Sequence, residues 1–329
     1  MAGRARVYAT RRLPGTALER LAEAVDLEVW PAPGGPPPED MARCVGDARG
    51  LLCLLTDQVD GPLIAACPRL GVISSCSAGV DHVDLAAATA RGIPVGFTPG
   101  VLTETTADLA FALLLAAARR IGEAERWLRA GRWTWEHRWE PNLLLGRDLH
   151  GATLGILGVG AIGLAMARRA RGFGMQVLGW SRRPKPEAEA QGVAFAPLGD
   201  VLAASDFVSV HVALAPATRH LIDAAALARM KPGAVLVNTA RGGVVDEPAL
   251  VEALREGRLA AAGLDVFADE PLPPDHPLLA LENVVLTPHI GSASVATRTR
   301  MADLAVENLL AGLAGRPLPR CANPEVYEV

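Results

Sequence analysis

Short runs of apolar residues alternate with helical patterns from residue 5 to residue 98 of the chain. The runs predicted as strands are ARVYAT, LEVW, GLLCLL, LGVISS and IPVGFT. They lack a strict alternation of apolar and polar positions, which is typical of parallel strands buried on both faces. Segments between them, such as LERLAEAV, have the spacing of an amphipathic helix. The segment PAPGGPPPED, residues 31–40, is expected to be a surface loop because the alternation continues after it.

A long helix is predicted next, starting near Thr103 and continuing through LAFALLLAAARR. From residue 153 a second alternation follows, with strands predicted in TLGILG, QVLGW, FVSVHV, AVLVNTA, AAGLDVF and NVVLTPHI. A chain of 329 residues is long for one hydrophobic core, so two domains are expected.

We therefore predict an α/β protein of two doubly wound, Rossmann-like or flavodoxin-like parallel-sheet domains with an active-site cleft between them. The last helix, about 294–313, is expected to return to the first unit. This gives a discontinuous substrate-binding domain at 1–101 plus about 292–329, and an NAD(P)-binding domain at 102–291.

Composition and charge exclude several classes of partner. Half of the residues are hydrophobic, the formal net charge is −4, and acids and bases are interspersed, which gives no reason to expect a nucleic acid or an anionic membrane. The longest apolar run, LAFALLLAAA at 109–118, is too short to span a bilayer, and the N-terminus lacks the apolar segment of a signal peptide. The five cysteines lack CxxC spacing, so we expect buried thiols in a reducing compartment, and neither a disulfide framework nor a metal site. The expected location is cytoplasmic.

The segment GVGAIG, residues 158–163, follows an apolar run and opens a helical pattern. In a dinucleotide-binding fold the first glycine permits a tight turn and the second lets the backbone approach a pyrophosphate. The third glycine allows close packing of helix and strand, and the helix N-terminus offers N–H groups to the anion. We expect cofactor contacts at Gly158, Gly160, Ala161, Ile162 and Gly163.

The end of the next predicted strand indicates which dinucleotide binds. An acid about 20 residues after the glycines would bind a ribose 2′-hydroxyl, whereas an arginine accommodates a 2′-phosphate. This chain has Ser181, Arg182 and Arg183 there. We predict a preference for NADP(H), with use of NAD(H) as the alternative if the arginines are simply solvated.

Three reactive residues follow predicted strands of the second unit: Arg241 in NTARGGVVDE, Glu270 in GLDVFADEPLP and His289 in VVLTPHIGSAS. Each alone is more often a solvated or structural residue. In a doubly wound sheet, however, ligands bind beyond the carboxyl ends of the strands. An arginine can hold a carboxylate by a two-pronged contact, and a glutamate favours the protonated form of a neighbouring histidine, which can then donate a proton. With a nicotinamide nearby, these residues would make a reductase of 2-oxo acids.

The motifs GVGAIG, NTARGGVVDE, GLDVFADEPLP and PHIGSAS occur in this order, and the chain resembles the D-isomer-specific 2-hydroxyacid dehydrogenases over essentially its whole length. LLCLLTDQVD, SCSAGVDHVD and VGFTPGVLTETTADLA are most similar to the glyoxylate reductase/hydroxypyruvate reductase branch. The resemblance implies reduction of glyoxylate to glycolate and of hydroxypyruvate to D-glycerate. In that reaction Arg241 binds and polarises the substrate, His289 is the proton donor and Glu270 tunes His289. A homodimer paired through the cofactor domains is also implied.

Further contacts are implied by the same resemblance. Substrate contacts fall on Ala78 and Gly79, through backbone N–H groups, and on Arg241, His289 and Ser292. Cofactor contacts fall on Thr106, Val212, Thr239, Ala240, Asp265 and Gly291. In close relatives an aromatic residue of the neighbouring subunit can touch the substrate near WEPNLLLG, and this chain departs from them with Leu143 and Leu144 after Trp139.

Two segments carry residue types that also occur in ligand sites. Asp81, His82 and Asp84 could suggest a metal site, but residues adjacent on one turn cannot all converge on an ion, so a helix cap and an exposed histidine are expected. RWTWEHRW, residues 132–139, could stack on nucleic-acid bases, but without a basic field around it a partly buried loop or dimer contact is expected.

The alternative functions are a D-3-phosphoglycerate dehydrogenase and a dinucleotide-sensing, corepressor-like binding protein of the same fold.

Overall fold

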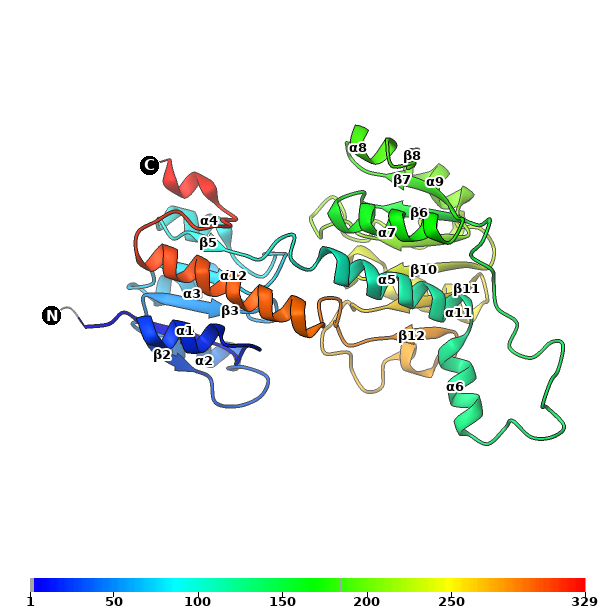
Figure 1. Ribbon diagram of the computed structural model, residues 1–329, viewed down its shortest axis with the longest axis horizontal. Helices are drawn as coiled ribbons and strands as arrows, with labels where there is room; N and C mark the ends of the chain where they lie inside the picture. The colour runs from blue at the N-terminus through cyan, green and yellow to red at the C-terminus, as the bar shows by residue number, and fades with distance from the viewer. Residues whose placement is uncertain (1–2, 184, 329) are drawn as a thin grey trace. The chain divides into compact units, whose positions relative to one another are not determined.

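The computed structural model describes residues 3–183 and 185–328 of the chain. The chain divides into two compact units, the first formed by Met1–Leu102 and Ser292–Val329 and the second by Thr103–Gly291. Each unit contains one parallel β-sheet with helices packed against it (Figure 1). The predicted α/β class, with two doubly wound parallel sheets, is confirmed.

The first unit has a five-stranded sheet in the order β2-β1-β3-β4-β5, and all neighbouring strands pair in parallel. This is the order of a flavodoxin-like sheet, in which the strand order reverses between β1 and β3. The strands are β1 (Arg6–Ala9), β2 (Asp26–Val29), β3 (Gly50–Cys53), β4 (Val72–Ser75) and β5 (Val95–Gly96).

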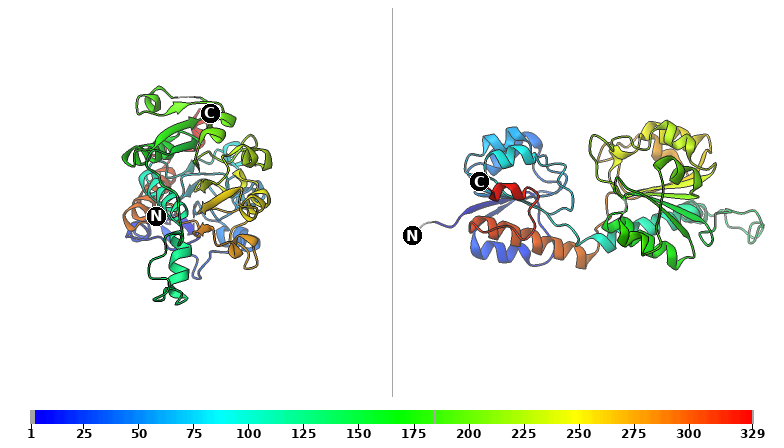
Figure 2. Two further views of the ribbon diagram at one scale, coloured as in Figure 1. Left: turned by 90° about the vertical axis from the view of Figure 1, so that its right-hand side faces the viewer. Right: turned by 90° about the horizontal axis from the view of Figure 1, so that it is seen from above.

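Helices cover both faces of the first sheet. They are α1 (Ala17–Ala24), α2 (Pro38–Val45), α3 (Gly61–Ala66), α4 (Leu85–Ala90) and α12 (Val295–Leu313), with a 3-10 turn at Pro324–Tyr327. Side chains of α2, α3 and α4 form one apolar cluster with the sheet, and side chains of α1 and α12 form the other. In the right-hand view of Figure 2 these two groups lie on opposite sides of the strands. The helix at the C-terminal end thus completes the core of the N-terminal sheet.

The second unit has a seven-stranded parallel sheet in the order β12-β11-β10-β9-β6-β7-β8. The chain runs outward from β6 to β8 and then returns to place β9 on the other side of β6. In such a sheet ligands bind where the strand order reverses, beyond the carboxyl ends of β6 and β9. The strands are β6 (Thr153–Leu157), β7 (Gln176–Trp180), β8 (Ala194–Phe195), β9 (Phe207–Val210), β10 (Ala234–Asn238), β11 (Leu259–Leu264) and β12 (Val284–Leu286).

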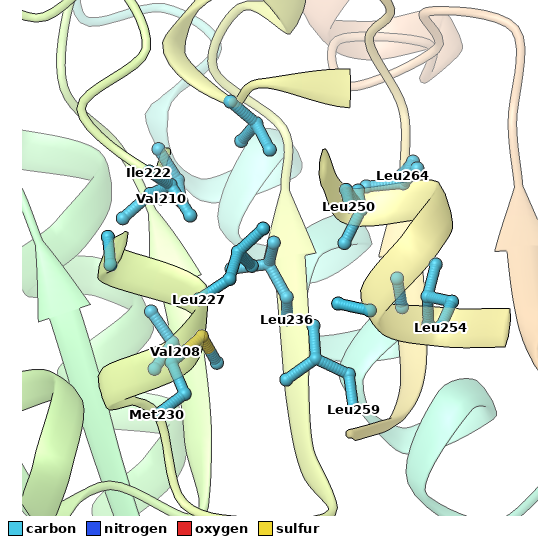
Figure 3. Close-up of a cluster of buried hydrophobic side chains, with 14 of the residues drawn as sticks. Val208, Val210, Ile222, Leu227, Met230, Leu236, Leu250, Leu254, Leu259 and Leu264 are labelled. Carbon is cyan, nitrogen blue, oxygen red and sulfur yellow. The ribbon is translucent and has the colours of Figure 1, made fainter. Parts of the chain in front are cut away.

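The helices of the second unit also form two layers. They are α5 (Thr103–Ala118), α6 (Ile121–Arg129), α7 (Ala161–Gly172), α8 (Pro186–Glu189), α9 (Leu198–Ala204), α10 (Ala224–Arg229) and α11 (Glu247–Arg255), with 3-10 turns at Gly242–Val244 and Pro277–Ala280. α5 and α7 pack on one face of the sheet, and α9, α10 and α11 pack on the other. Figure 3 shows Leu236 of β10 among side chains from α10 and α11. From Leu109 to Ala118 α5 has only apolar residues, which fits its contacts with α7, β10 and β11. None of the described helices combines the length and the hydropathy that a membrane span requires.

Two details differ from the sequence prediction. β8 was not predicted, because it is only two residues long and lies at the sheet edge. The sequence predicts one long helix that continues through Arg120, but α5 ends at Ala118, whose carbonyl accepts a bond from the N–H of Arg147. Arg120 itself has a left-handed conformation with φ of 54°, and its guanidinium pairs with Glu123 in α6.

Candidate active site

The glycine loop joins β6 to α7 at the carboxyl edge of the second sheet. Gly158 has φ of 97°, and a Cβ there would lie 2.7 Å from the carbonyl carbon of His211 and from the nitrogen of Val212. A Cβ on Gly163 would lie 2.3 Å from the carbonyl oxygen of Gly158. A Cβ on Gly160, the N-cap of α7, would meet no described atom within 4 Å. The protein's own backbone therefore requires glycine at positions 158 and 163, whereas the space beside Gly160 is open.

A cavity of about 570 Å³ lies against this loop. Ser181, which follows β7, accepts a hydrogen bond from the N–H of Val159 at 2.9 Å, so its side chain is fixed beside the loop. A hydroxyl that accepts one bond can still donate its own hydrogen. Arg182, Arg183 and Lys185 also line the cavity, which makes this side of it basic. Sequence reasoning missed Lys185, although SRRPK placed three basic residues within one short segment.

These residues fit a dinucleotide. The first N–H groups of a helix have no partner within the helix and attract anions, and α7 is a regular helix of 12 residues. The open space at Gly160 allows a phosphate to approach the backbone. His211 also lines the cavity, but burial lowers the pKa of its imidazole to about 4, so it is neutral at physiological pH. The positive charge offered to a ligand therefore comes from the two arginines and the lysine.

His289 and Glu270 form a hydrogen-bonded pair beyond β12 and β11. Nδ1 of His289 lies 2.7 Å from Oε2 of Glu270, and Oε1 of Glu270 accepts a bond from the N–H of Phe267 at 3.0 Å. The two side chains are 23% and 26% exposed. Burial by itself would raise the pKa of Glu270, but the bonds from His289 and Phe267 and the charges of His289 and Arg241 outweigh burial and lower that pKa. Glu270 is thus an ionised carboxylate that orients the imidazole.

Asp265 holds the turn that carries His289. His289 has φ of 50°, a left-handed conformation that is uncommon for a residue with a side chain, and its N–H donates to the carbonyl of Asp265 at 2.9 Å. The Asp265 side chain is buried and accepts three bonds, at 2.6 to 2.8 Å, from the Thr287 hydroxyl and the N–H groups of Ile290 and Gly291. Burial raises the pKa of Asp265, although these bonds and the charge of His289 act in the opposite direction. Its contact with a nicotinamide stays a prediction.

Arg241 follows β10 in a loop that packs against the segment bearing Glu270. The side-chain amide of Asn238 spans this loop and donates to the carbonyl of Arg241 at 2.9 Å. At Gly242 an added Cβ would lie only 1.8 Å from the carbonyl carbon of Phe267. Since the charge of Arg241 also acts on Glu270, the three residues predicted to be catalytic lie in one region of the second unit.

The other predicted cofactor residues of the second unit lie at the same edge. Thr106 of α5 is close to Gly291, where an added Cβ would lie 3.4 Å from the Thr106 methyl carbon and 3.2 Å from Oδ2 of Asp265. Thr239 follows β10, and its buried hydroxyl has no hydrogen-bond partner within residues 3–183 and 185–328. Four predicted cofactor residues remain. Ala161 and Ile162 begin α7, Val212 lines the cavity at the glycine loop, and Ala240 precedes Arg241.

Three predicted substrate residues, Ala78, Gly79 and Ser292, belong to the first unit, and their role toward a substrate stays a prediction. Ala78 and Gly79 lie in the loop after β4, where both residues are half-buried. Ser292 lies two residues before Ser294, which caps α12 by accepting a bond from the N–H of Thr297.

The segment from Asp81 to Asp84 serves as a turn and a helix cap. Asp84 caps α4 by accepting a bond from the N–H of Ala87 at 2.9 Å, as predicted. The prediction of an exposed histidine is wrong: His82 is half-buried because the turn folds it back onto Ser75, the last residue of β4. Among the described residues, no three acidic, histidine or cysteine side chains are grouped so that they could hold a metal ion.

The tryptophan-rich segment after α6 is exposed in the single chain. Trp133, Trp135 and Trp139 are 59%, 77% and 80% exposed. The predicted partial burial is therefore wrong for one chain, because the segment extends away from the seven-stranded sheet (Figure 1). The predicted dimer contact is not tested by this observation.

The fold and sequence have close relatives. Residues 111–291 match the family described as D-isomer specific 2-hydroxyacid dehydrogenase, NAD binding domain. The chain is 49% identical over 325 residues to the glyoxylate reductase of Korarchaeum cryptofilum, an alignment that covers 98% of this chain and 97% of that protein. A solved structure of a protein from Thermus thermophilus is 52% identical, with a TM-score of 0.90, and the match covers 96% of this chain and 99% of that one.

A third relative was solved with ligands bound. The NADPH-dependent glyoxylate/hydroxypyruvate reductase of Sinorhizobium meliloti, in complex with NADP and malonate, is 37% identical with a TM-score of 0.83, and the match covers 98% of both chains. The similarity therefore extends over both units. Together with the glycine loop and the His289–Glu270 pair, it shows that this chain is an oxidoreductase of 2-oxo acids that binds a nicotinamide dinucleotide. The chain belongs to the D-isomer-specific 2-hydroxyacid dehydrogenase family.

Proposed function

We propose that the protein uses NADPH to reduce glyoxylate to glycolate and hydroxypyruvate to D-glycerate. The observation that carries the proposal is the His289–Glu270 pair near Arg241, in a unit whose dinucleotide cavity is lined by basic side chains. The names of two relatives, a glyoxylate reductase and a glyoxylate/hydroxypyruvate reductase, support this choice of substrates.

The proposed chemistry needs one hydride and one proton for each carbonyl reduced. When bound, a reduced nicotinamide supplies the hydride. Nδ1 of His289 is bonded to Glu270, so Nε2 donates the proton to the carbonyl oxygen as it becomes a hydroxyl. The Glu270 carboxylate stabilises the imidazolium before this transfer. Arg241 holds the substrate and polarises its carbonyl group.

Further groups would bind the substrate carboxylate. In this proposal the N–H groups of Ala78 and Gly79 donate to it, and Ser292 is a third contact. These interactions are made equally in the ground state and the transition state, so they act on KM more than on kcat.

A preference for NADPH over NADH is part of the proposal. Ser181 is bonded to the glycine loop with its own hydrogen free to donate, and Arg182, Arg183 and Lys185 line the same cavity. The nearest following acids, Glu187 and Glu189, lie in α8. Charge-assisted bonds to a 2′-phosphate therefore face no opposing carboxylate at the end of β7 among the described residues.

This preference is tested by kcat/KM for the two reduced cofactors in the wild type and in Ser181→Asp/Arg182→Ala. We expect the wild type to prefer NADPH and the double variant to lose or reverse the preference. Arg171→Ala is the matched control, because Arg171 lies near the C-terminal end of α7 and bonds to the carbonyl of Gln191. A wild type that prefers NADH would contradict the assignment.

We further propose a homodimer formed through the second unit. Large apolar side chains are exposed at six positions of α6 and the segment between α6 and β6: Ile121, Leu128, Trp133, Trp135, Trp139 and Leu145. Exposed apolar surface of this extent is typical of a protein interface. Sedimentation analysis tests the proposal: we expect a dimer of the wild type and weakened association in Trp135→Ser/Trp139→Ser, whereas a monomeric wild type would contradict it.

Substrate identity is tested by following NADPH absorbance with a panel of 2-oxo acids. We expect rapid oxidation with glyoxylate and hydroxypyruvate and slow oxidation with 3-phosphohydroxypyruvate. A clear preference for the phosphorylated acid would identify a D-3-phosphoglycerate dehydrogenase. Binding of NADPH without turnover of any acid would favour a dinucleotide-sensing protein.

A further inference from the structure

The loop that follows β4 is held by a chain of buried hydrogen bonds. Oγ of Ser75 lies 2.7 Å from Oγ of Ser77, and the Ser77 hydroxyl donates to the carbonyl oxygen of Gly79 at 2.6 Å. At the other end, Nε2 of His82 lies 2.9 Å from Oγ of Ser75. Both serines are buried. The chain therefore links a half-buried histidine to the backbone of the loop that contains Ala78 and Gly79.

The number of hydrogens gives this chain one direction. A serine hydroxyl has a single hydrogen, and Ser77 gives its hydrogen to the carbonyl of Gly79. Ser77 must then accept the hydrogen of Ser75, and Ser75 must accept a hydrogen from Nε2 of His82. Every hydroxyl in the chain is satisfied in this arrangement, and loss of one member would leave a buried polar group unpaired.

This series of hydrogen bonds fixes the plane of the peptide between Gly79 and Val80. Because the Gly79 carbonyl is directed to Ser77, and the N–H of a trans peptide points opposite to its C=O, the N–H of Val80 points away from the serines. The start of the loop is fixed as well, because the carbonyl of Ser77 accepts a bond from the N–H of Thr98 at 2.7 Å. The backbone around Ala78 and Gly79 is thus held before any ligand arrives.

We propose that Ser77 and His82 are positioning residues for substrate binding, which hold the loop at Ala78 and Gly79 ready to receive the substrate carboxylate. This inference rests on the proposed function, in which those two N–H groups bind that carboxylate. Donors that are already ordered lose little conformational entropy when a ligand binds, so the chain strengthens substrate binding without touching the substrate.

Ser74 provides a matched control within the same strand. It is as buried as Ser75, but its hydroxyl donates to the carbonyl of Ala305 in α12 at 2.7 Å. Ser74→Ala removes a buried serine bond of similar length from the opposite face of the sheet. It reproduces the general loss of stability but leaves the loop after β4 intact.

The experiment measures glyoxylate KM, kcat and the NADPH dissociation constant in five variants of the full chain. We expect Ser77→Ala and His82→Leu to raise KM roughly threefold to tenfold, the net effect of one hydrogen bond, with kcat and NADPH binding unchanged. His82→Gln retains a side-chain N–H donor and is expected to keep a KM near that of the wild type. Ser75→Ala should behave like Ser77→Ala, and Ser74→Ala should not change KM.

Amide hydrogen exchange in the peptide 76–82 is measured on the same proteins without substrate. Faster exchange in Ser77→Ala, but not in Ser74→Ala, supports the part of the proposal in which these hydrogen bonds hold the loop. If the wild type also reduces no 2-oxo acid, the proposed function fails and the holding of the loop stands. Wild-type KM and wild-type exchange in Ser77→Ala would overturn the inference. An equal rise of KM in Ser74→Ala, or in His82→Gln and His82→Leu alike, would also overturn it. If Ser77→Ala does not fold, the two His82 variants decide the question.

Discussion

Position 242 is expected to require glycine, because the backbone that positions Glu270 passes close to it. A Cβ added to Gly242 would lie 1.8 Å from the carbonyl carbon of Phe267, 1.9 Å from its oxygen and 2.4 Å from the nitrogen of Ala268. Reaching the 3.4 Å of ordinary contact from 1.8 Å requires a shift of about 1.6 Å, and backbone atoms cannot rotate away as a side chain does. The same Phe267 donates its N–H to Glu270, so the shift would displace the carboxylate from His289.

The perturbation is therefore Gly242→Ala, and it should reduce both stability and catalysis. Overpacking costs about 1–3 kcal/mol, and we expect the upper end of that range because only backbone can move. In a unit of this size that corresponds to a fall in Tm of roughly 6–12 °C. A misplacement of about 1 Å at a catalytic group can cost on the order of 10²-fold in kcat.

Thermal unfolding and glyoxylate turnover measure the two effects, and Gly243→Ala is the matched control. A Cβ on Gly243 would meet the Leu214 side chain at 3.4 Å, an ordinary contact, and neither glycine has a positive φ. The two variants thus differ in local space and not in backbone preference. Wild-type Tm and kcat in Gly242→Ala, or equal losses in both variants, would show that the backbone at Phe267 does not require a glycine at position 242.

Two further substitutions test the groups around His289. Glu270 has a lowered pKa and is ionised, so Glu270→Gln removes the anion that favours the imidazolium of His289. On the alkaline side of the kcat/KM profile, the rate of reduction should therefore begin to fall at a lower pH than in the wild type. An unchanged alkaline limb would contradict this role of Glu270. Asp265→Asn places an amide N–H₂ against N–H donors of the 287–291 turn and removes charge-assisted bonds worth about 1.5–3 kcal/mol, so kcat and Tm should both fall. Retention of both values would show that Asp265 does not hold this turn.

Much of the fold could be predicted because the strands are buried on both faces. β3, β4, β9 and β10 are buried along their whole lengths, and such strands leave continuous apolar runs in the sequence. β8 leaves no such signal, since it has two residues and only edge pairing with β7. The end of α5 was also missed, because it depends on a bond from Arg147, which is distant in sequence.

In the candidate site, too, features that depend on contacts between residues distant in sequence could not be predicted. Gly158 and Gly163 stand in a recognisable motif, because strand, loop and helix are consecutive in the chain. The requirement for Gly242 comes from Phe267, and Asp265 acts on a turn more than 20 residues later. The direction of the His82 side chain likewise depends on how its turn folds back, which spacing alone does not encode.

The most direct test of the proposed reaction is NADPH oxidation by glyoxylate in the wild type and in His289→Ala, with NADPH binding measured on both proteins. His289 belongs to the turn after β12 and not to the glycine loop, so the variant should still bind NADPH. Loss of a positioned proton donor typically costs about 10²–10⁴-fold in rate, and we expect a loss of that size. Near wild-type turnover in His289→Ala would contradict the account.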